Sequence, residues 1–208
     1  MGLLKDWEIV LGLDLAGSPK NKTGYAYFKK GNFYVGYLYK DDEILRLCQN
    51  FQIVMIDAPL TLPADRRTIE DQGSHLRECD KLLLKRGHKF FPITLGPMRK
   101  LTERGMKFKV LLSSLGIKVF ETFPGAIYDL LGIRRKDKKA ILNFYLSLNL
   151  KLENREYFQD ELDAIACWLA GVCYLKGQSY SFSGSDGEIV VTTRSCLDSL
   201  TKGCSTNS

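Results

Sequence analysis

The chain has 208 residues, of which 45% are apolar and 26% charged, and its net charge is +6. This length suffices for one substantial hydrophobic core, so we expect a single globular domain. No run approaches the ~18 apolar residues of a membrane span, which argues against a membrane protein. The excess of basic residues is a mild bias toward anionic partners, and a solvated basic surface explains it equally well.

The six cysteines are scattered without a C-x-x-C motif and only two histidines accompany them, so we expect no zinc site. Lys5, Asp6 and Glu8 precede the first apolar run, which is not how a secretory signal peptide begins. We therefore predict a cytoplasmic protein whose cysteines are reduced.

The first predicted strand, residues 9–14, is apolar except for Asp14 at its end. A turn at residues 17–19 separates it from two more predicted strands, at residues 23–28 and 33–39, which form a hairpin. An aspartate at the end of a buried strand is costly to desolvate unless something binds it. The alternative, that Asp14 merely caps the turn through backbone N–H groups, is equally compatible with this residue alone.

The pattern of an apolar strand that ends in an acid occurs twice more. Residues 51–57 predict a strand ending in Asp57, and residues 117–121 predict one ending in Glu121. A late helix, predicted over residues 157–175, contains Asp160 and Asp163, which share one face because they are three residues apart. Acids in a first helical turn also complement the macrodipole, which explains Asp160 better than Asp163.

A long irregular connection, at about residues 61–105, follows the strand that ends in Asp57. Connections of this length in a compact domain are usually functional or mobile. Basic residues gather there and in a second cluster near residue 135. We interpret them as candidate nucleic-acid contacts, although a solvated helix face explains the charge equally well. The candidates are Lys85, Arg86, Lys89, Arg99, Lys100, Arg104, Arg134 and Arg135.

Strands that alternate with helices after an opening meander predict an α/β fold with a mixed sheet flanked by helices. With the strand order 3-2-1-4-5, Asp14 and Asp57 meet at the carboxyl edge of the sheet, where ligands bind in open α/β sheets. Residues 179–182 and 188–193 predict a terminal hairpin. We expect one domain over residues 1–194 and a flexible polar tail over residues 195–208.

Five acids are therefore candidates for one catalytic site. They are Asp14, Asp57, Glu121, Asp160 and Asp163. So many carboxylates stay charged together only with cations between them. Oxygen ligands suit Mg²⁺ or Mn²⁺, and two such ions can activate a water and stabilise the leaving oxygen in phosphodiester hydrolysis. The predicted metal ligands are Asp14, Asp57, Asp160 and Asp163, and the sequence leaves open which of Glu121, Asp160 and Asp163 touches the ion directly.

These motifs resemble those of nucleases with an RNase H-like fold. Residues 12–14 and 23–25, with Asp160-x-x-Asp163, are similar to RuvC-type Holliday-junction resolvases. Over about residues 8–193 the chain more closely resembles an uncharacterised family of predicted nucleases with this fold. The stretches that carry this resemblance are Asp14-Leu15-Ala16-Gly17-Ser18-Pro19, Ile56-Asp57-Ala58-Pro59-Leu60, Arg77-x-x-Asp80, Glu121-Thr122-Phe123-Pro124 and Asp160-x-x-Asp163-Ala164. The resemblance implies an RNase H-like fold with a long basic insertion after the fourth strand and, by extension, a metal-dependent nuclease.

The chain departs from the resolvase pattern at one acid. Those enzymes place a glutamate at the end of the fourth strand, where this chain has Asp57, and the shorter side chain could shift the second metal position. Glu121 on the next strand is a candidate to compensate. Arg77 and Asp80 match the predicted-nuclease pattern without a catalytic task, so we expect them to form a buried salt bridge that anchors the insertion.

Two other functions compete with a nuclease. A non-catalytic nucleic-acid- or protein-binding module that retains the fold would use the same basic clusters. A phosphotransferase of the actin-like kind also opens with a strand-end aspartate, but it needs two such domains, which 208 residues supply only in a homodimer. The sequence does not distinguish DNA from RNA, and it leaves the oligomeric state open.

Overall fold

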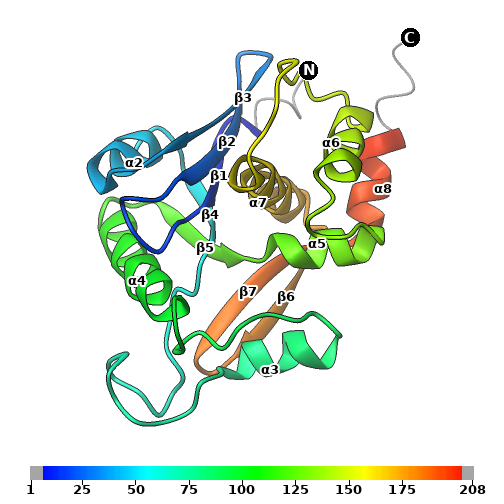
Figure 1. The fold of residues 1–208 in the computed structure, drawn as a ribbon. Helices are drawn as coiled ribbons and strands as arrows, with labels where there is room; N and C mark the ends of the chain where they lie inside the picture. The colour runs from blue at the N-terminus through cyan, green and yellow to red at the C-terminus, as the bar shows by residue number, and fades with distance from the viewer. Residues whose placement is uncertain (1–6, 203–208) are drawn as a thin grey trace.

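The computed structural model describes residues 7–202 as an α/β fold, in which one mixed sheet of seven strands carries helices on both faces (Figure 1). The strands are β1 (Val10–Asp14), β2 (Thr23–Lys29), β3 (Asn32–Leu38), β4 (Ile53–Asp57), β5 (Lys118–Thr122), β6 (Ser179–Gly184) and β7 (Gly187–Thr192). The helices are α2 (Asp41–Cys48), α3 (Glu78–Lys85), α4 (Met98–Ser114), α5 (Pro124–Leu131), α6 (Lys138–Ser147), α7 (Gln159–Leu175) and α8 (Arg194–Lys202). Within this part of the chain, no helix is long and apolar enough to cross a membrane.

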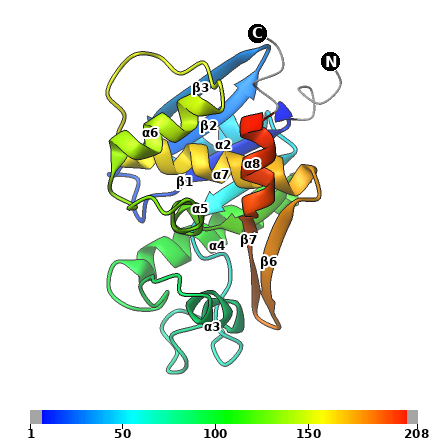
Figure 2. The ribbon, with the colours of Figure 1, turned by 90° about the vertical axis from the view of Figure 1, so that its right-hand side faces the viewer.

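The strands lie in the order β3-β2-β1-β4-β5-β7-β6. β1 pairs antiparallel with β2 and parallel with β4, and β5 is parallel to both β4 and β7. The prediction of a mixed sheet with flanking helices is confirmed. The predicted order 3-2-1-4-5 is incomplete, because the C-terminal hairpin of β6 and β7 joins the same sheet beside β5 and adds two strands. Helix α3, from the insertion after β4, packs against this hairpin (Figure 2).

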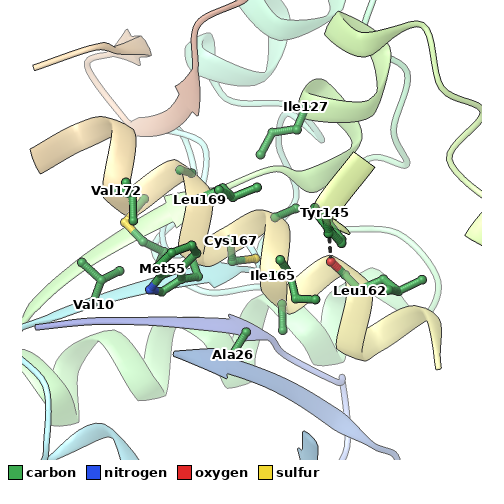
Figure 3. Close-up of a cluster of buried hydrophobic side chains, with 14 of the residues drawn as sticks. Val10, Ala26, Met55, Ile127, Tyr145, Leu162, Ile165, Cys167, Leu169 and Val172 are labelled. Atoms are coloured by element: carbon green, nitrogen blue, oxygen red, sulfur yellow. Dashed lines mark hydrogen bonds between the residues drawn. The ribbon is translucent and has the colours of Figure 1, made fainter. Parts of the chain in front are cut away.

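Alternate residues of the central strands supply two separate cores. Val10 and Met55 pack against α7 on one face, together with side chains of α5 and α6 (Figure 3). Their neighbours Leu11 and Val54 point to the opposite face, where α2 and α4 cover the sheet. Because side chains alternate along a strand, every other residue of β1 and β4 faces α7. This parity decides which side of the sheet each strand-end acid serves.

Helix α7 lies directly against the sheet because glycines leave room for its backbone. A Cβ at Gly12 of β1 would collide with the backbone of Ala164 and Trp168, and a Cβ at Gly24 of β2 would collide with the backbone of Asp160. A side chain at either position would push the helix away. The two glycines therefore set the distance between the acidic end of α7 and the ends of the central strands.

The C-terminal region differs from the prediction of a flexible tail. Residues 194–202 form α8, whose Cys196 and Leu197 are buried. A disulfide joins Cys173 of α7 to Cys196, so these two cysteines are not reduced as expected, whereas Cys48, Cys79 and Cys167 are free thiols. Residues 203–208 of the predicted tail lie outside the described residues, as do Lys5 and Asp6, on which the expectation about a signal peptide rests.

Candidate functional site

Asp14 and Asp57 lie side by side at the carboxyl edge of the sheet. Asp14 is the last residue of β1 and Asp57 the last of β4, and the two are direct partners in the parallel register. Neighbouring strands are about 4.8 Å apart. By the alternation of side chains, both carboxylates point to the α7 face, and both are partly buried. The prediction that these two strand ends meet is confirmed.

Asp160 and Asp163 reach the same edge from the first turns of α7. The Asp163 Oδ1 atom accepts hydrogen bonds from the Tyr128 hydroxyl, at 2.6 Å, and from Gln159 Nε2, at 2.9 Å. The charges of Asp57, Asp163 and Asp160 all act on Asp14. The four aspartates thus share one electrostatic environment, which we call the acid site.

Burial and mutual repulsion disfavour ionisation throughout the acid site. Burial raises the pKa of the Asp14 carboxyl well above its usual range, and the charge of Asp57 raises it further. The pKa of Asp57 is also raised well above its usual range, first by burial and then by Asp163, although the Arg135 guanidinium opposes this. Burial raises the pKa of Asp163 to about 6 against the opposing hydrogen bonds from Tyr128 and Gln159. For Asp160, burial raises the pKa while nearby Lys22 opposes it.

Within residues 7–202, the carboxylates of Asp14 and Asp57 accept no hydrogen bond and form no ion pair. Buried acids ordinarily have such partners, because an uncompensated charge is costly to desolvate. The same part of the chain contains no group of three or more His, Cys, Asp or Glu side chains already arranged to hold a metal ion. The acid site is therefore a set of adjacent carboxylates without a closed ligand shell.

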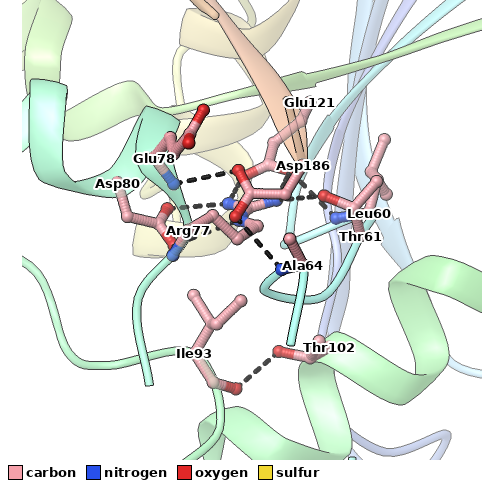
Figure 4. Close-up of polar contacts among 10 residues, drawn as sticks. All are labelled: Leu60, Thr61, Ala64, Arg77, Glu78, Asp80, Ile93, Thr102, Glu121 and Asp186. Carbon is pink, nitrogen blue, oxygen red and sulfur yellow. Dashed lines mark hydrogen bonds and ion pairs between the residues drawn. The ribbon is translucent and has the colours of Figure 1, made fainter. Parts of the chain in front are cut away.

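Glu121 is not part of the acid site, contrary to the prediction. Its partner in the β4–β5 register is Ile56, one residue before Asp57, and Ile56 packs on the α4 face. The alternation of side chains therefore turns Glu121 to the opposite side of the sheet from Asp57. Its carboxylate accepts a hydrogen bond from the Leu60 backbone N–H at 2.9 Å and is bound by Arg77 (Figure 4).

Arg77 forms the salt bridge with Asp80 that the sequence predicted, and it binds Glu121 as well. The Arg77 Nη2 atom is 2.8 Å from Asp80 Oδ1 and 2.6 Å from Glu121 Oε1, and the side chain is fully buried. Arg77 Nη1 also donates to Glu121 Oε2 at 2.7 Å and to the Thr61 hydroxyl at 2.9 Å. The network joins the insertion to β5 and has a structural task.

Arg104 is a structural residue and not a nucleic-acid contact. It is buried, and its guanidinium is 2.7 Å from Asp41 Oδ1 at the start of α2. Arg104 also donates to the Ala16 carbonyl, at 2.5 Å, and to the Tyr39 carbonyl, at 3.2 Å. These contacts fix the turn after β1 relative to α2 and α4, and they leave no free donor face for a phosphate.

The other predicted nucleic-acid contacts fall into two groups. Lys85, Lys100 and Arg134 are exposed, and Arg99 lies 2.5 Å from Glu70 in an ion pair. Arg86, Lys89 and Arg135 instead line one groove of about 780 Å³ between the end of α3, α5 and the β6–β7 hairpin. We call this the basic groove and define it by Arg86, His88, Lys89, Arg135, Tyr180 and Arg194.

The sequence reasoning missed the residues that support Asp163. Tyr128 of α5 and Gln159 of α7 donate hydrogen bonds to its carboxylate. Beside them, the Tyr145 hydroxyl of α6 donates a hydrogen bond of 2.9 Å to the Leu162 carbonyl. Gln159 lies four residues before Asp163, a spacing at which helical side chains meet, so it offered a signal in the sequence. Nothing in the sequence brings Tyr128 to α7, because that contact depends on how α5 packs.

Replacing Tyr128 with phenylalanine is expected to raise the pKa of Asp163 above about 6, because the hydroxyl stabilises the ionised carboxylate. A carbon-detected NMR titration of the aspartate carboxyls would measure the shift. Loss of a hydrogen bond to a charged group should also lower the free energy of unfolding at neutral pH by about 2 kcal/mol. Tyr145→Phe is the comparison, since its hydroxyl donates to the Leu162 carbonyl and reaches Asp163 only through the Tyr128 hydroxyl, 3.1 Å away; it should change the Asp163 pKa less, and equal pKa changes in both variants would contradict this role of Tyr128.

Comparison with known proteins adds no relative from which a role could be transferred to these residues. No family model matches the chain, and no curated protein matches it. The candidate function therefore rests on the acid site and its surroundings alone.

Proposed function

We propose that the protein is a metal-dependent nuclease that hydrolyses phosphodiester bonds at the acid site. The observation that carries the proposal is the pairing of Asp14 with Asp57 at adjacent strand ends, without a hydrogen bond or ion pair to either carboxylate in residues 7–202. Burial first, and then the charges of the neighbouring aspartates, raise the pKa values of both carboxyls, and the Arg135 guanidinium opposes the shift only at Asp57. A divalent cation held between them would compensate their charges.

The donor set fits Mg²⁺ or Mn²⁺. All the candidate donors are carboxylate oxygens, which hard divalent ions prefer. Asp14 and Asp57 would hold the ion from the two strands, and Asp163 would complete the set from α7. The acids share an edge without a closed ligand shell, as expected for carboxylates that repel one another.

The chain positions these groups before any ion arrives. The β1–β4 ladder fixes the Asp14 and Asp57 backbones, while Gly12 and Gly24 hold α7 close. A bound divalent ion supplies Lewis acidity and lowers the pKa of a water. Tyr128 occupies Oδ1 of Asp163, so Oδ2 remains for an ion or a proton.

The proposal includes an RNase H-like fold. The run β3-β2-β1-β4-β5 within the sheet supports it, as does the position of α7, which packs on β1 with its acids at the carboxyl ends of the strands. Glu121 does not compensate for the aspartate at the end of β4, since it lies on the other face. Asp57 itself is therefore the second strand-end ligand in this proposal.

The test is cleavage of a labelled panel of single strands, duplexes, an RNA–DNA hybrid and a four-way junction, with Mn²⁺, Mg²⁺ or EDTA. We expect products that require the metal and that disappear in identically purified Asp57→Asn, which controls for a contaminating nuclease. Cleavage that is equal in the variant, or no cleavage of any substrate, would overturn the proposal. Salt-sensitive binding without cleavage would instead favour a nucleic-acid-binding module.

A further inference from the structure

The basic groove combines unpaired cations with an exposed aromatic side chain. Within residues 7–202, neither Arg86 nor Lys89 forms an ion pair. Arg86 lies 5.6 Å from the centre of the Tyr180 ring, and Tyr180 remains 45% exposed. An exposed aromatic face beside free cations is the combination that binds the bases and phosphates of a nucleic-acid strand.

Asp129 neutralises only part of the positive charge of the basic groove. Asp129 accepts hydrogen bonds from His88, at 2.7 Å, and from Arg135, at 3.0 and 2.5 Å. Arg194 is paired with Asp198 outside the groove at 3.1 Å. Arg86 and Lys89 thus remain as uncompensated positive charges at the rim. An anionic ligand would gain the most from these two residues.

The groove is lined by aromatic rings that contact one another. The ring centres of Tyr180 and Phe182 are 5.0 Å apart in an edge-to-face arrangement, and the His88 ring lies 6.2 Å from Phe182. Phe182 is buried in the small core that packs on the hairpin, and its ring contacts that of Tyr180. A base stacked on Tyr180 would therefore meet a surface that is already in place.

Arg135 links the basic groove to the acid site. It lines the groove, and its guanidinium lies 5.0 Å from the ring of Phe123, the residue after β5. Its charge also acts on Asp57. Residues 192–194, at the carboxyl end of the parallel strand β7, line the groove as well, so groove and acid site share the carboxyl edge of the sheet.

We propose that the basic groove binds single-stranded nucleic acid, with a base stacked on Tyr180, phosphates on Arg86 and Lys89, and the strand running past Arg135 toward the acid site. This assignment rests on the proposed function, whose substrate class it names. A duplex keeps its bases stacked on one another and offers no free base face to Tyr180, so the aromatic lining favours a single strand.

The experiment is fluorescence anisotropy of a labelled 12-nucleotide single strand in EDTA, where metal-dependent cleavage does not occur. Arg86→Ala/Lys89→Ala should weaken binding about tenfold and reduce the slope of log affinity against log salt by roughly 0.7 for each lost phosphate contact. Tyr180→Ala should also weaken binding roughly tenfold, but without changing the salt slope, and Tyr180→Phe should restore it. The matched control, Lys118→Ala/Lys151→Ala, removes two exposed cations outside the groove.

Binding that is equal in the groove and control variants would overturn the assignment, as would a duplex that binds as tightly as the single strand. Cleavage with Mn²⁺ is measured separately on the same variants. Groove-dependent binding by a wild-type protein that cleaves nothing would support the groove and refute the nuclease. Metal-dependent cleavage and binding that both ignore the groove substitutions would support the nuclease and refute the groove.

Discussion

Asp14→Asn is expected to slow metal-dependent cleavage by about two orders of magnitude and at the same time to stabilise the metal-free protein. The asparagine is nearly isosteric, but it removes one anionic ligand beside Asp57. A metal ion contributes several kcal/mol of transition-state stabilisation, so we expect a loss of about 3 kcal/mol or roughly 10²-fold in rate. The measurement is initial cleavage rate at saturating Mn²⁺.

The gain in stability follows from the direction of the pKa shifts. Asp14, Asp57 and Asp163 all have pKa values raised in the folded state, so the fold binds their protons more tightly than the unfolded chain does. Their contribution to stability is full below the unfolded pKa and is lost as pH rises through the folded pKa. For Asp163 this window runs from about pH 4 to about 6. In Asp14→Asn, the free energy of unfolding of the metal-free protein should therefore decrease less as pH rises.

A divalent metal ion should stabilise the wild-type protein at neutral pH, where the ionised carboxylates destabilise the metal-free fold. Mg²⁺ at 100 times its dissociation constant would stabilise the wild-type protein by about 2.7 kcal/mol, and protonation of the carboxylates at pH 4.5 would diminish this. Thermal unfolding with and without Mg²⁺ measures both effects. Asp42→Asn is the control, because Asp42 is an exposed acid paired with Arg46 on α2. A metal-induced shift that is unchanged in Asp14→Asn would place the ion elsewhere.

The strand-end acids show how far sequence reasoning reached. Asp14 and Asp57 each end an apolar run, and the parallel pairing of β1 with β4 made their meeting predictable. Glu121 also ends an apolar run, yet it pairs with Ile56 and faces away. The sequence predicted that each acid lies at the end of a strand, but it did not predict the register between β4 and β5. A shift of one residue exchanges the two faces, so this one unknown decided the role of Glu121.

The basic residues were harder to assign for a related reason. Arg104, Arg135 and Lys89 look alike in the sequence, but Arg104 is buried against Asp41 while the other two line the basic groove. Which cation is paired depends on tertiary contacts that join residues far apart in the chain. The same holds for the β6–β7 hairpin, which was predicted as an element but whose place beside β5 was not.

Arg77→Met is expected to destabilise the protein more than any substitution at the acid site or in the basic groove. Its guanidinium bridges Asp80 and Glu121 in the interior, and all three side chains are buried. Removing one partner of a buried charge network typically costs about 3–5 kcal/mol, because the remaining charges lose their compensation. In a chain of this size that corresponds to a fall of roughly 10 °C in Tm. Arg77→Lys should recover little, since an ammonium cannot bridge two carboxylates as a planar guanidinium does.

The pH dependence of the stability of Arg77→Met tests whether the unpaired charge of Glu121 causes the destabilisation. Burial raises the pKa of Glu121 in the wild-type protein, and Arg77 opposes this, so without Arg77 that pKa rises further. The variant should therefore be least impaired at acid pH and lose stability as pH rises through the Glu121 pKa. Adding Glu121→Gln to Arg77→Met removes one unpaired charge and should restore part of the Tm.

The single variant Glu121→Gln separates a structural role from a catalytic one. Glu121 lies on the α4 face, bound to Arg77 and the Leu60 N–H, so its loss should lower Tm and leave metal-dependent cleavage intact below that temperature. Loss of cleavage in a folded Glu121→Gln protein would contradict this structural role and indicate that Glu121 takes part in the reaction. Cleavage that survives in Glu121→Gln but fails in Asp14→Asn would show that only the carboxylates facing α7 carry the reaction.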